Sequence, residues 1–137
     1  AGRMLQDDKN EMPDAMREAY KQMREEQGDA PSPFAATYLG LQRPGAYDMM
    51  MIEPPAAEAP TSTAVVFLHG YAGNFLLPCW QVSQAVKDLD VLTACPSTDF
   101  VGRWDSPNGE QIVREVVKEL RARGITKLVL AGLSNGG

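Results

Sequence analysis

The stretch KLVLAGLSNGG, residues 127–137, joins an apolar run to a glycine-rich turn. The run Leu128–Leu130 is typical of a strand that is buried in a sheet. The turn matches the pattern G-x-S-x-G at residues 132–136, which requires a strand directly before it. A serine on such a sharp turn has a strained backbone, and side chains two residues before and after it would collide with the strand and with the following helix. The pattern therefore predicts a strand that ends in a tight turn with Ser134 at its tip.

Outward from this turn, the chain alternates between buried strands and helices. TAVVFLHG (63–70) and VLTACP (91–96) are predicted strands, and residues 78–89 and 110–123 are predicted helices. The second helix has the clearer pattern, with an apolar face and Gly124 as its terminator. Strands that alternate with helices form parallel crossovers. We therefore expect an α/β fold with an open, mostly parallel sheet and helices on both faces.

The amino-terminal part has a different pattern. Residues 1–35 are predicted to be an amphipathic helix (11–27) with a linker, and residues 36–137 to form the α/β domain. The apolar face of the helix is rich in methionine, which favours core packing over the alternative of a partner-binding surface. Two apolar stretches, 36–41 and 46–55, flank Pro44 and Gly45 and predict a hairpin.

Composition excludes several classes of function. The 137 residues carry a net charge of −5, and their basic residues are scattered, which argues against a nucleic-acid partner or an anionic membrane surface. No apolar run approaches the roughly 20 residues that a membrane span needs. With two cysteines, Cys79 and Cys95, a disulfide-rich scaffold and a cysteine-based zinc site are both excluded, and we expect no metal and no cofactor. Two buried thiols are the simpler interpretation of this pair, and a bridge between them is the alternative.

A second glycine-containing turn follows another predicted strand. Its sequence is FLHGYAGN (67–74), and that strand is predicted to be buried. The carboxyl ends of parallel strands share one crevice, so we expect this turn to face Ser134. Backbone N–H groups are free at the start of a helix and point toward developing negative charge. The N–H groups of Tyr71 and Asn135 are therefore predicted to bind an oxyanion.

On these two turns, residues 64–137 resemble the α/β-hydrolase family. GLSNGG looks like its nucleophile elbow, with Ser134 as nucleophile between Gly132 and Gly136, and HGYAG looks like its oxyanion turn. The elbow is also similar to those of the polyhydroxyalkanoate depolymerase and feruloyl esterase branch. The resemblance implies a serine hydrolase of carboxylic esters, with amide and thioester substrates open to the same chemistry. In that motif His69 and Gly70 are supporting residues.

The chain departs from the family after the serine. Family members place an acid and then a histidine downstream, whereas only three residues follow Ser134 here. The single histidine, His69, is predicted to orient the oxyanion turn. A serine without a positioned base is a poor nucleophile. We therefore expect an amino-terminal fragment that is inactive alone, whose partners are a small ester substrate and a missing carboxy-terminal half in the same or another chain.

The loop STDFVGRWDSPNG (97–109) allows two interpretations. Phe100 and Trp104 would line a substrate pocket, or Trp104 would only pack the loop. Asp99 and Asp105 are predicted to cap the loop or to be solvated. The alternative function is a hydrolase-like module that binds a ligand without catalysis. Phosphate-binding loops are disfavoured, because neither turn has a P-loop lysine or the G-x-G-x-x-G pattern.

Overall fold

The computed structural model describes residues 11–27, 47–55, 60–71 and 76–137. The chain divides into two units, Ala1–Pro31 and Ser32–Gly137. The first unit contains helix α1 (Glu11–Gln27), which confirms the predicted helix over residues 11–27. Met23 of this helix is 7% exposed and Met16 is 51% exposed, so the predicted core packing of the methionine face is confirmed at Met23 and wrong at Met16.

Four strands of the second unit form one sheet: β1 (Met49–Ile52), β2 (Thr63–Leu68), β3 (Leu92–Pro96) and β4 (Lys127–Gly132). Their order is β1-β3-β2-β4. β2 is parallel to both of its neighbours, while β1 is antiparallel to β3. The predicted open, mostly parallel sheet is thereby confirmed. The second arm of the predicted hairpin is β1, and its first arm (36–41) lies outside the described residues.

Two helices pack on this sheet, α3 (Leu76–Val86) and α4 (Pro107–Ala122). α4 begins three residues before the predicted start, because Ser106 is its N-cap and accepts a hydrogen bond from the Gly109 N–H. Pro107 suits the first helical position, where its missing N–H costs nothing. α4 is followed by Gly124 with a φ of 92°, a conformation that terminates helices and favours glycine.

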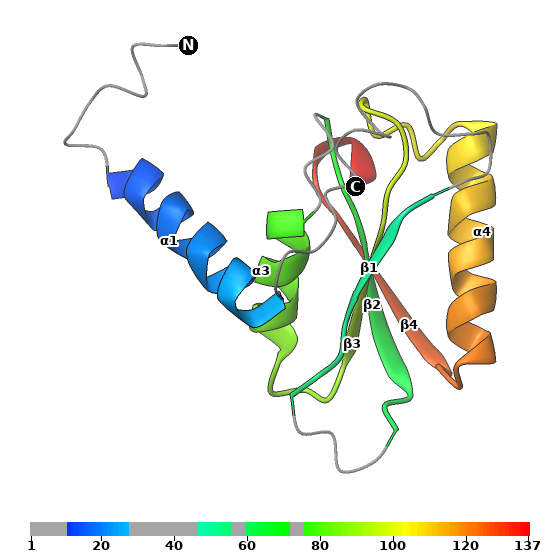
Figure 1. The fold of residues 1–137 in the computed structure, drawn as a ribbon. Helices are drawn as coiled ribbons and strands as arrows, with labels where there is room; N and C mark the ends of the chain where they lie inside the picture. Colours follow the sequence, from blue (N-terminus) through cyan, green and yellow to red (C-terminus); the bar gives the residue numbers. More distant parts are fainter. Residues whose placement is uncertain (1–10, 28–46, 56–59, 72–75) are drawn as a thin grey trace. The chain divides into compact units, whose positions relative to one another are not determined.

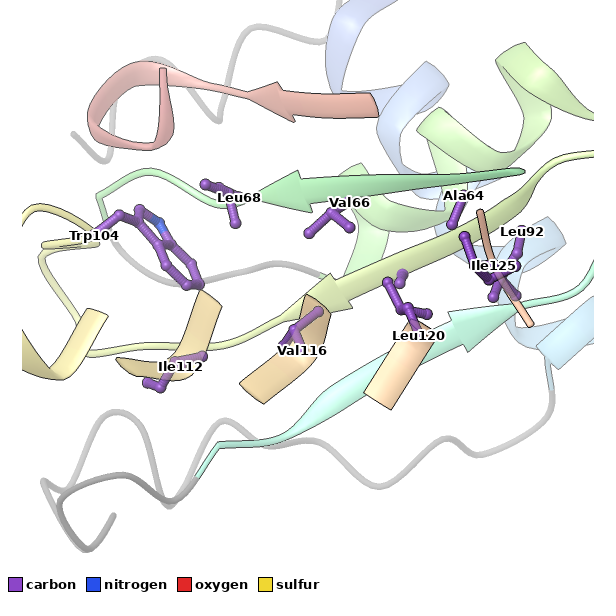
Figure 2. Close-up of a cluster of buried hydrophobic side chains, with 10 residues drawn as sticks. Ala64, Val66, Leu68, Leu92, Trp104, Ile112, Val116, Leu120 and Ile125 are labelled. Carbon is purple, nitrogen blue, oxygen red and sulfur yellow. The ribbon is translucent and has the colours of Figure 1, made fainter. Parts of the chain in front are cut away.

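The main core lies between α4 and one face of the sheet (Figure 2). Ile112, Val116 and Leu120 recur at helical spacing and are fully buried. They pack against alternate residues of the strands, namely Ala64, Val66, Leu68, Leu92 and Ala94. Trp104 and Ile125 belong to the same cluster. The cluster explains why the alternate positions of β2 and β3 are apolar: they face the helix.

The opposite face of the sheet packs against α3, so helices cover both faces (Figure 1). Cys95 of β3 points away from α4, because side chains alternate along a strand and its neighbour Ala94 faces that helix. It forms a disulfide with Cys79 of α3, with the Cα atoms 6.0 Å apart. The interpretation of two buried thiols is therefore wrong, and the alternative of a bridge is confirmed. The bond joins α3 covalently to an interior strand.

β4 lies at one edge of the sheet and pairs, among the described residues, only with β2. Its Val129 and Leu130 are 43% and 61% exposed. The predicted burial of this strand is wrong for these two residues, because no described strand covers the outer edge. No helix in the described part of the chain combines the length and apolarity needed to cross a membrane.

Candidate active site

The turn after β4 has the strained geometry that its sequence predicts. Ser134 has a φ of 56°, in the left-handed region that residues other than glycine rarely adopt. A short 3₁₀ helix, η1 (Ser134–Gly136), begins at this serine. Hydrogen bonds from the Gly136 and Gly137 N–H groups to Leu133 and Ser134 carbonyls, at 2.9 and 3.0 Å, close the turn. Ser134 is exposed at the tip.

Neither of the glycines that flank Ser134, Gly132 and Gly136, has room for a side chain. A Cβ atom on Gly132 would lie 1.8 Å from the Gly136 carbonyl oxygen, and one on Gly136 would lie 2.0 Å from the Leu68 carbonyl oxygen. These neighbours are backbone atoms, which do not move aside as a side chain does. The turn therefore folds against the end of β2 only because both positions lack a side chain.

The two glycine-containing turns meet at the carboxyl ends of β2 and β4. A Cβ on Gly70 would lie 2.8 Å from the Cβ of Ser134 and 2.7 Å from the Leu133 carbonyl oxygen. The Leu133 N–H also donates to the Leu68 carbonyl at 3.2 Å. Parallel pairing of β2 with β4 brings these ends together. The turn that contains His69 and Gly70 thus packs directly on Ser134.

Two hydrogen bonds hold the His69 ring in one tautomer. The buried ring accepts a hydrogen bond at Nε2 from the Thr98 N–H, at 3.0 Å, so the proton is on Nδ1. Nδ1 then donates to the Gly70 carbonyl at 2.8 Å. Burial lowers the pKa of His69 below 6.5, although the Gly70 carbonyl and Asp99 act in the opposite direction. Both ring nitrogens are occupied, so the ring orients the turn and cannot take a proton from Ser134.

The predicted oxyanion donors lie on the two turns that meet. Tyr71 follows Gly70 and is 64% exposed, and Asn135 follows Ser134 and is also exposed. Asn135 is the second residue of η1, in the first turn of a helix, where backbone N–H groups have no partner within the helix. The site has an accessible serine hydroxyl and candidate donors, but no described histidine is available to act as its base.

The two aromatic residues of the following loop have different surroundings. Trp104 is buried in the main core, and its Nε1–H donates to the His69 carbonyl at 2.8 Å. Its ring meets the His69 ring edge to face, at 5.3 Å. This position favours loop packing over a place in a substrate pocket. Phe100 is half-buried and makes an edge-to-face contact with Tyr71, at 5.0 Å between ring centroids. Phe100 therefore lies beside a predicted oxyanion residue.

Asp99 is a loop cap, which confirms one of the two roles expected of it. Its Oδ1 accepts hydrogen bonds from the N–H groups of Val101, Gly102 and Arg103, at 2.9–3.1 Å. Its Oδ2 accepts from the Arg103 guanidinium at 2.9 Å. Burial alone raises the pKa of Asp99, but the Arg103 N–H and guanidinium and the Gly102 N–H outweigh it, and the pKa lies below its usual value. Asp105, the other acid of the loop, is exposed.

Sequence reasoning missed two contacts in this region. One is the Thr98 N–H that selects the His69 tautomer, and the other is a hydrogen bond from the Asn135 side chain to the Val101 carbonyl. An aspartate three residues before a glycine, as in Asp99 and Gly102, is a signal for a capped turn and is visible in the sequence. The described residues hold no group of three or more acidic, cysteine or histidine side chains that suits a metal ion.

Comparison with protein-family models and with curated proteins gives no match to this chain.

Proposed function

We propose that this chain carries the nucleophile and the oxyanion hole of a serine hydrolase that acts on carboxylic esters. The observation that carries the proposal is the backbone of Ser134, whose φ of 56° is enforced between two glycines that have no room for a side chain. Strain of this kind persists only where the surrounding structure requires it, and it clusters at active sites. Here it raises a serine above the end of a parallel strand, as in a nucleophile elbow.

The mechanism follows from the two turns. The Ser134 oxygen attacks the ester carbonyl carbon while a general base accepts the hydroxyl proton. The carbonyl π electrons move to the oxygen, and the backbone N–H groups of Tyr71 and Asn135 stabilise that oxyanion. Collapse of the intermediate expels the alcohol, which takes up the proton, and leaves an acyl group on Ser134. Water then attacks the acyl carbon in the same way, which releases the carboxylic acid and returns the proton to the Ser134 oxygen.

The general base comes from outside these 137 residues in this proposal, because the single histidine is committed at both ring nitrogens. In the proposal, the acid that orients this base comes from the same source, in this or another chain. The outer edge of β4 supports the proposal, since Val129 and Leu130 are exposed on the strand that leads to Ser134. An exposed apolar edge strand is an unfavourable surface that pairing with a further strand would cover.

The test is active-site labelling of the full-length protein encoded by the gene. A fluorophosphonate probe should react with wild-type protein at Ser134, identified by mass spectrometry of the labelled peptide, and Ser134→Ala should abolish both labelling and hydrolysis of p-nitrophenyl esters. Ser62→Ala is a matched control, because Ser62 is also exposed but lies before β2, at the opposite end of the strand. It should label like wild type. Folded wild-type protein that is not labelled contradicts the proposal.

A second candidate function is ligand binding without catalysis, by a hydrolase-like module. The specific observation in its favour is that His69, the one histidine, is buried and fully hydrogen-bonded. This candidate predicts that a short-chain ester binds near Ser134 without being hydrolysed. NMR shifts of the Tyr71 and Asn135 amides on ester titration, with no labelling and no product, would support it over the hydrolase.

A further inference from the structure

The loop from Ser97 to Trp104, called here the β3 loop, contacts both turns of the candidate site. It follows β3, which is parallel to β2, so it leaves the sheet at the same edge as the other two turns. Asp99 closes it with hydrogen bonds to three consecutive N–H groups and to the Arg103 guanidinium. A loop closed by one carboxylate in this way has a defined shape without regular secondary structure.

One side of the β3 loop packs on the turn at His69 and Gly70. A Cβ on Gly102, whose φ is 74°, would lie 2.9 Å from the Gly70 carbonyl oxygen and 3.0 Å from that of His69. The Thr98 N–H donates to the His69 ring, and Trp104 donates to the His69 carbonyl. Backbone and side-chain contacts therefore hold this turn, and with it Tyr71, against the loop.

The other side of the β3 loop is bound to the elbow by the Asn135 side chain. The Asn135 Nδ2 donates to the Val101 carbonyl at 2.8 Å. Val101 is within the segment that Asp99 closes, because its N–H donates to Asp99 Oδ1 at 3.1 Å. The Asn135 carboxamide thus connects the nucleophile turn to a loop that is itself fastened to the oxyanion turn.

We propose that Asn135 and Asp99 are positioning residues that set the separation of the two oxyanion donors through the β3 loop. This inference rests on the proposed function. The donors are on turns after different strands, and the Asn135 backbone N–H belongs to the same residue as the side chain that binds Val101. Anchoring that side chain to Val101 therefore places the N–H relative to Tyr71. The arrangement also gives a reason for asparagine after the serine, since the position needs a short side chain with an amide donor.

The test compares Asn135→Asp with wild type in the full-length protein. Aspartate has the same shape but no donor, so the bond to the Val101 carbonyl becomes a repulsion between two acceptors. A displaced oxyanion donor acts on the transition state rather than on substrate binding. We expect kcat for p-nitrophenyl ester hydrolysis and the rate of fluorophosphonate labelling to fall about 10- to 100-fold, with KM changed less than about threefold.

A second set of variants tests the loop. Asp99→Ala should lower kcat in the same direction, and Asp99→Asn should restore most of it, because an amide oxygen still accepts the three N–H bonds. Asp105→Ala is the matched control: Asp105 is an exposed acid just after the β3 loop, and its loss should leave kcat unchanged. In the double variant Asn135→Asp/Asp99→Ala, the fold-change in kcat should be less than the product of the two single effects, because both act through one loop.

The outcomes separate this inference from the function on which it rests. Wild-type protein that is not labelled contradicts the proposed function itself. Wild-type protein that is labelled, together with Asn135→Asp protein labelled within about twofold of the same rate, overturns the positioning role and leaves the hydrolase intact. Hydrogen exchange gives an independent readout: in Asn135→Asp protein the Val101, Gly102 and Arg103 amides should exchange faster, and unchanged exchange also overturns the inference.

Discussion

β2 and β4 are neighbouring parallel strands with similar apolar sequences, TAVVFL and KLVLAG, and opposite surroundings. β2 is interior and buried at every position but its first, whereas β4 is at the edge and has four exposed residues of six. Both end in turns that meet at Ser134. The difference teaches that an apolar run predicts a strand, while burial depends on what lies on either side of it.

The largest expected effect breaks the contact between the two strand ends. Gly136→Ala places a methyl group 2.0 Å from the Leu68 carbonyl oxygen, where only backbone could give way. We expect a loss of at least about 3 kcal/mol in the free energy of unfolding, measured by urea denaturation. Gly137→Ala is the control, because its Cβ would make ordinary contact at 3.4 Å, and it should cost less than about 0.5 kcal/mol. Equal costs would contradict the close approach of the Ser134 turn to the end of β2.

The next prediction concerns the disulfide, which fixes the strand that pairs with β2 on its inner side. β3, the inner neighbour of β2, is joined to α3 by the Cys79–Cys95 disulfide, with a sequence separation of 16. Replacing both cysteines with alanine should lower the free energy of unfolding by about 3 kcal/mol, because it frees a loop of about 15 residues in the unfolded chain. Hydrogen exchange should accelerate most in β3 and α3. If exchange accelerated most at the β4 amides instead, the prediction that the disulfide stabilises β3 and α3 would be wrong.

A matched pair of valines compares the strands directly. Val66 of β2 is fully buried, and Val129 of β4 is 43% exposed. Val66→Ala should cost about 2 kcal/mol, since it removes buried methyl groups and leaves a cavity. Val129→Ala should cost less than about 0.5 kcal/mol by the same urea titration. A cost at Val129 close to that at Val66 would show that a partner covers the edge of β4 in solution.

The comparison of β2 with β4 also shows which parts of the fold and of the candidate site the sequence predicts. Periodicity and glycine placement predict α1, α4 and the strands from β2 to β4, because these signals are local. The meeting of His69–Gly70 with Ser134 is also predicted, since parallel strands bring their carboxyl ends to one edge. The exposure of Val129 and Leu130 is not, because it depends on neighbours that no local pattern specifies. The disulfide and the bond from Asn135 to Val101 depend on distances between segments far apart in sequence, which composition does not encode.

The smallest expected effect is a pH dependence of the free energy of unfolding, which comes from the turn after β2 and not from the turn after β4. β2 is followed directly by His69, whose pKa burial lowers below 6.5, whereas residues 128–137 contain no titratable side chain. As pH falls through 6.5, the unfolded chain takes up the histidine proton before the folded one does, so folding loses stability. The contribution is full above about pH 6.5 and declines below it, as protonation of Nε2 would oppose the Thr98 N–H bond. Urea titrations between about pH 7.5 and 5.5 should show this decline in wild type and not in His69→Gln, which keeps an acceptor but cannot titrate. Parallel pH profiles for the two proteins would mean that the neutral ring is not what holds the turn against Ser134.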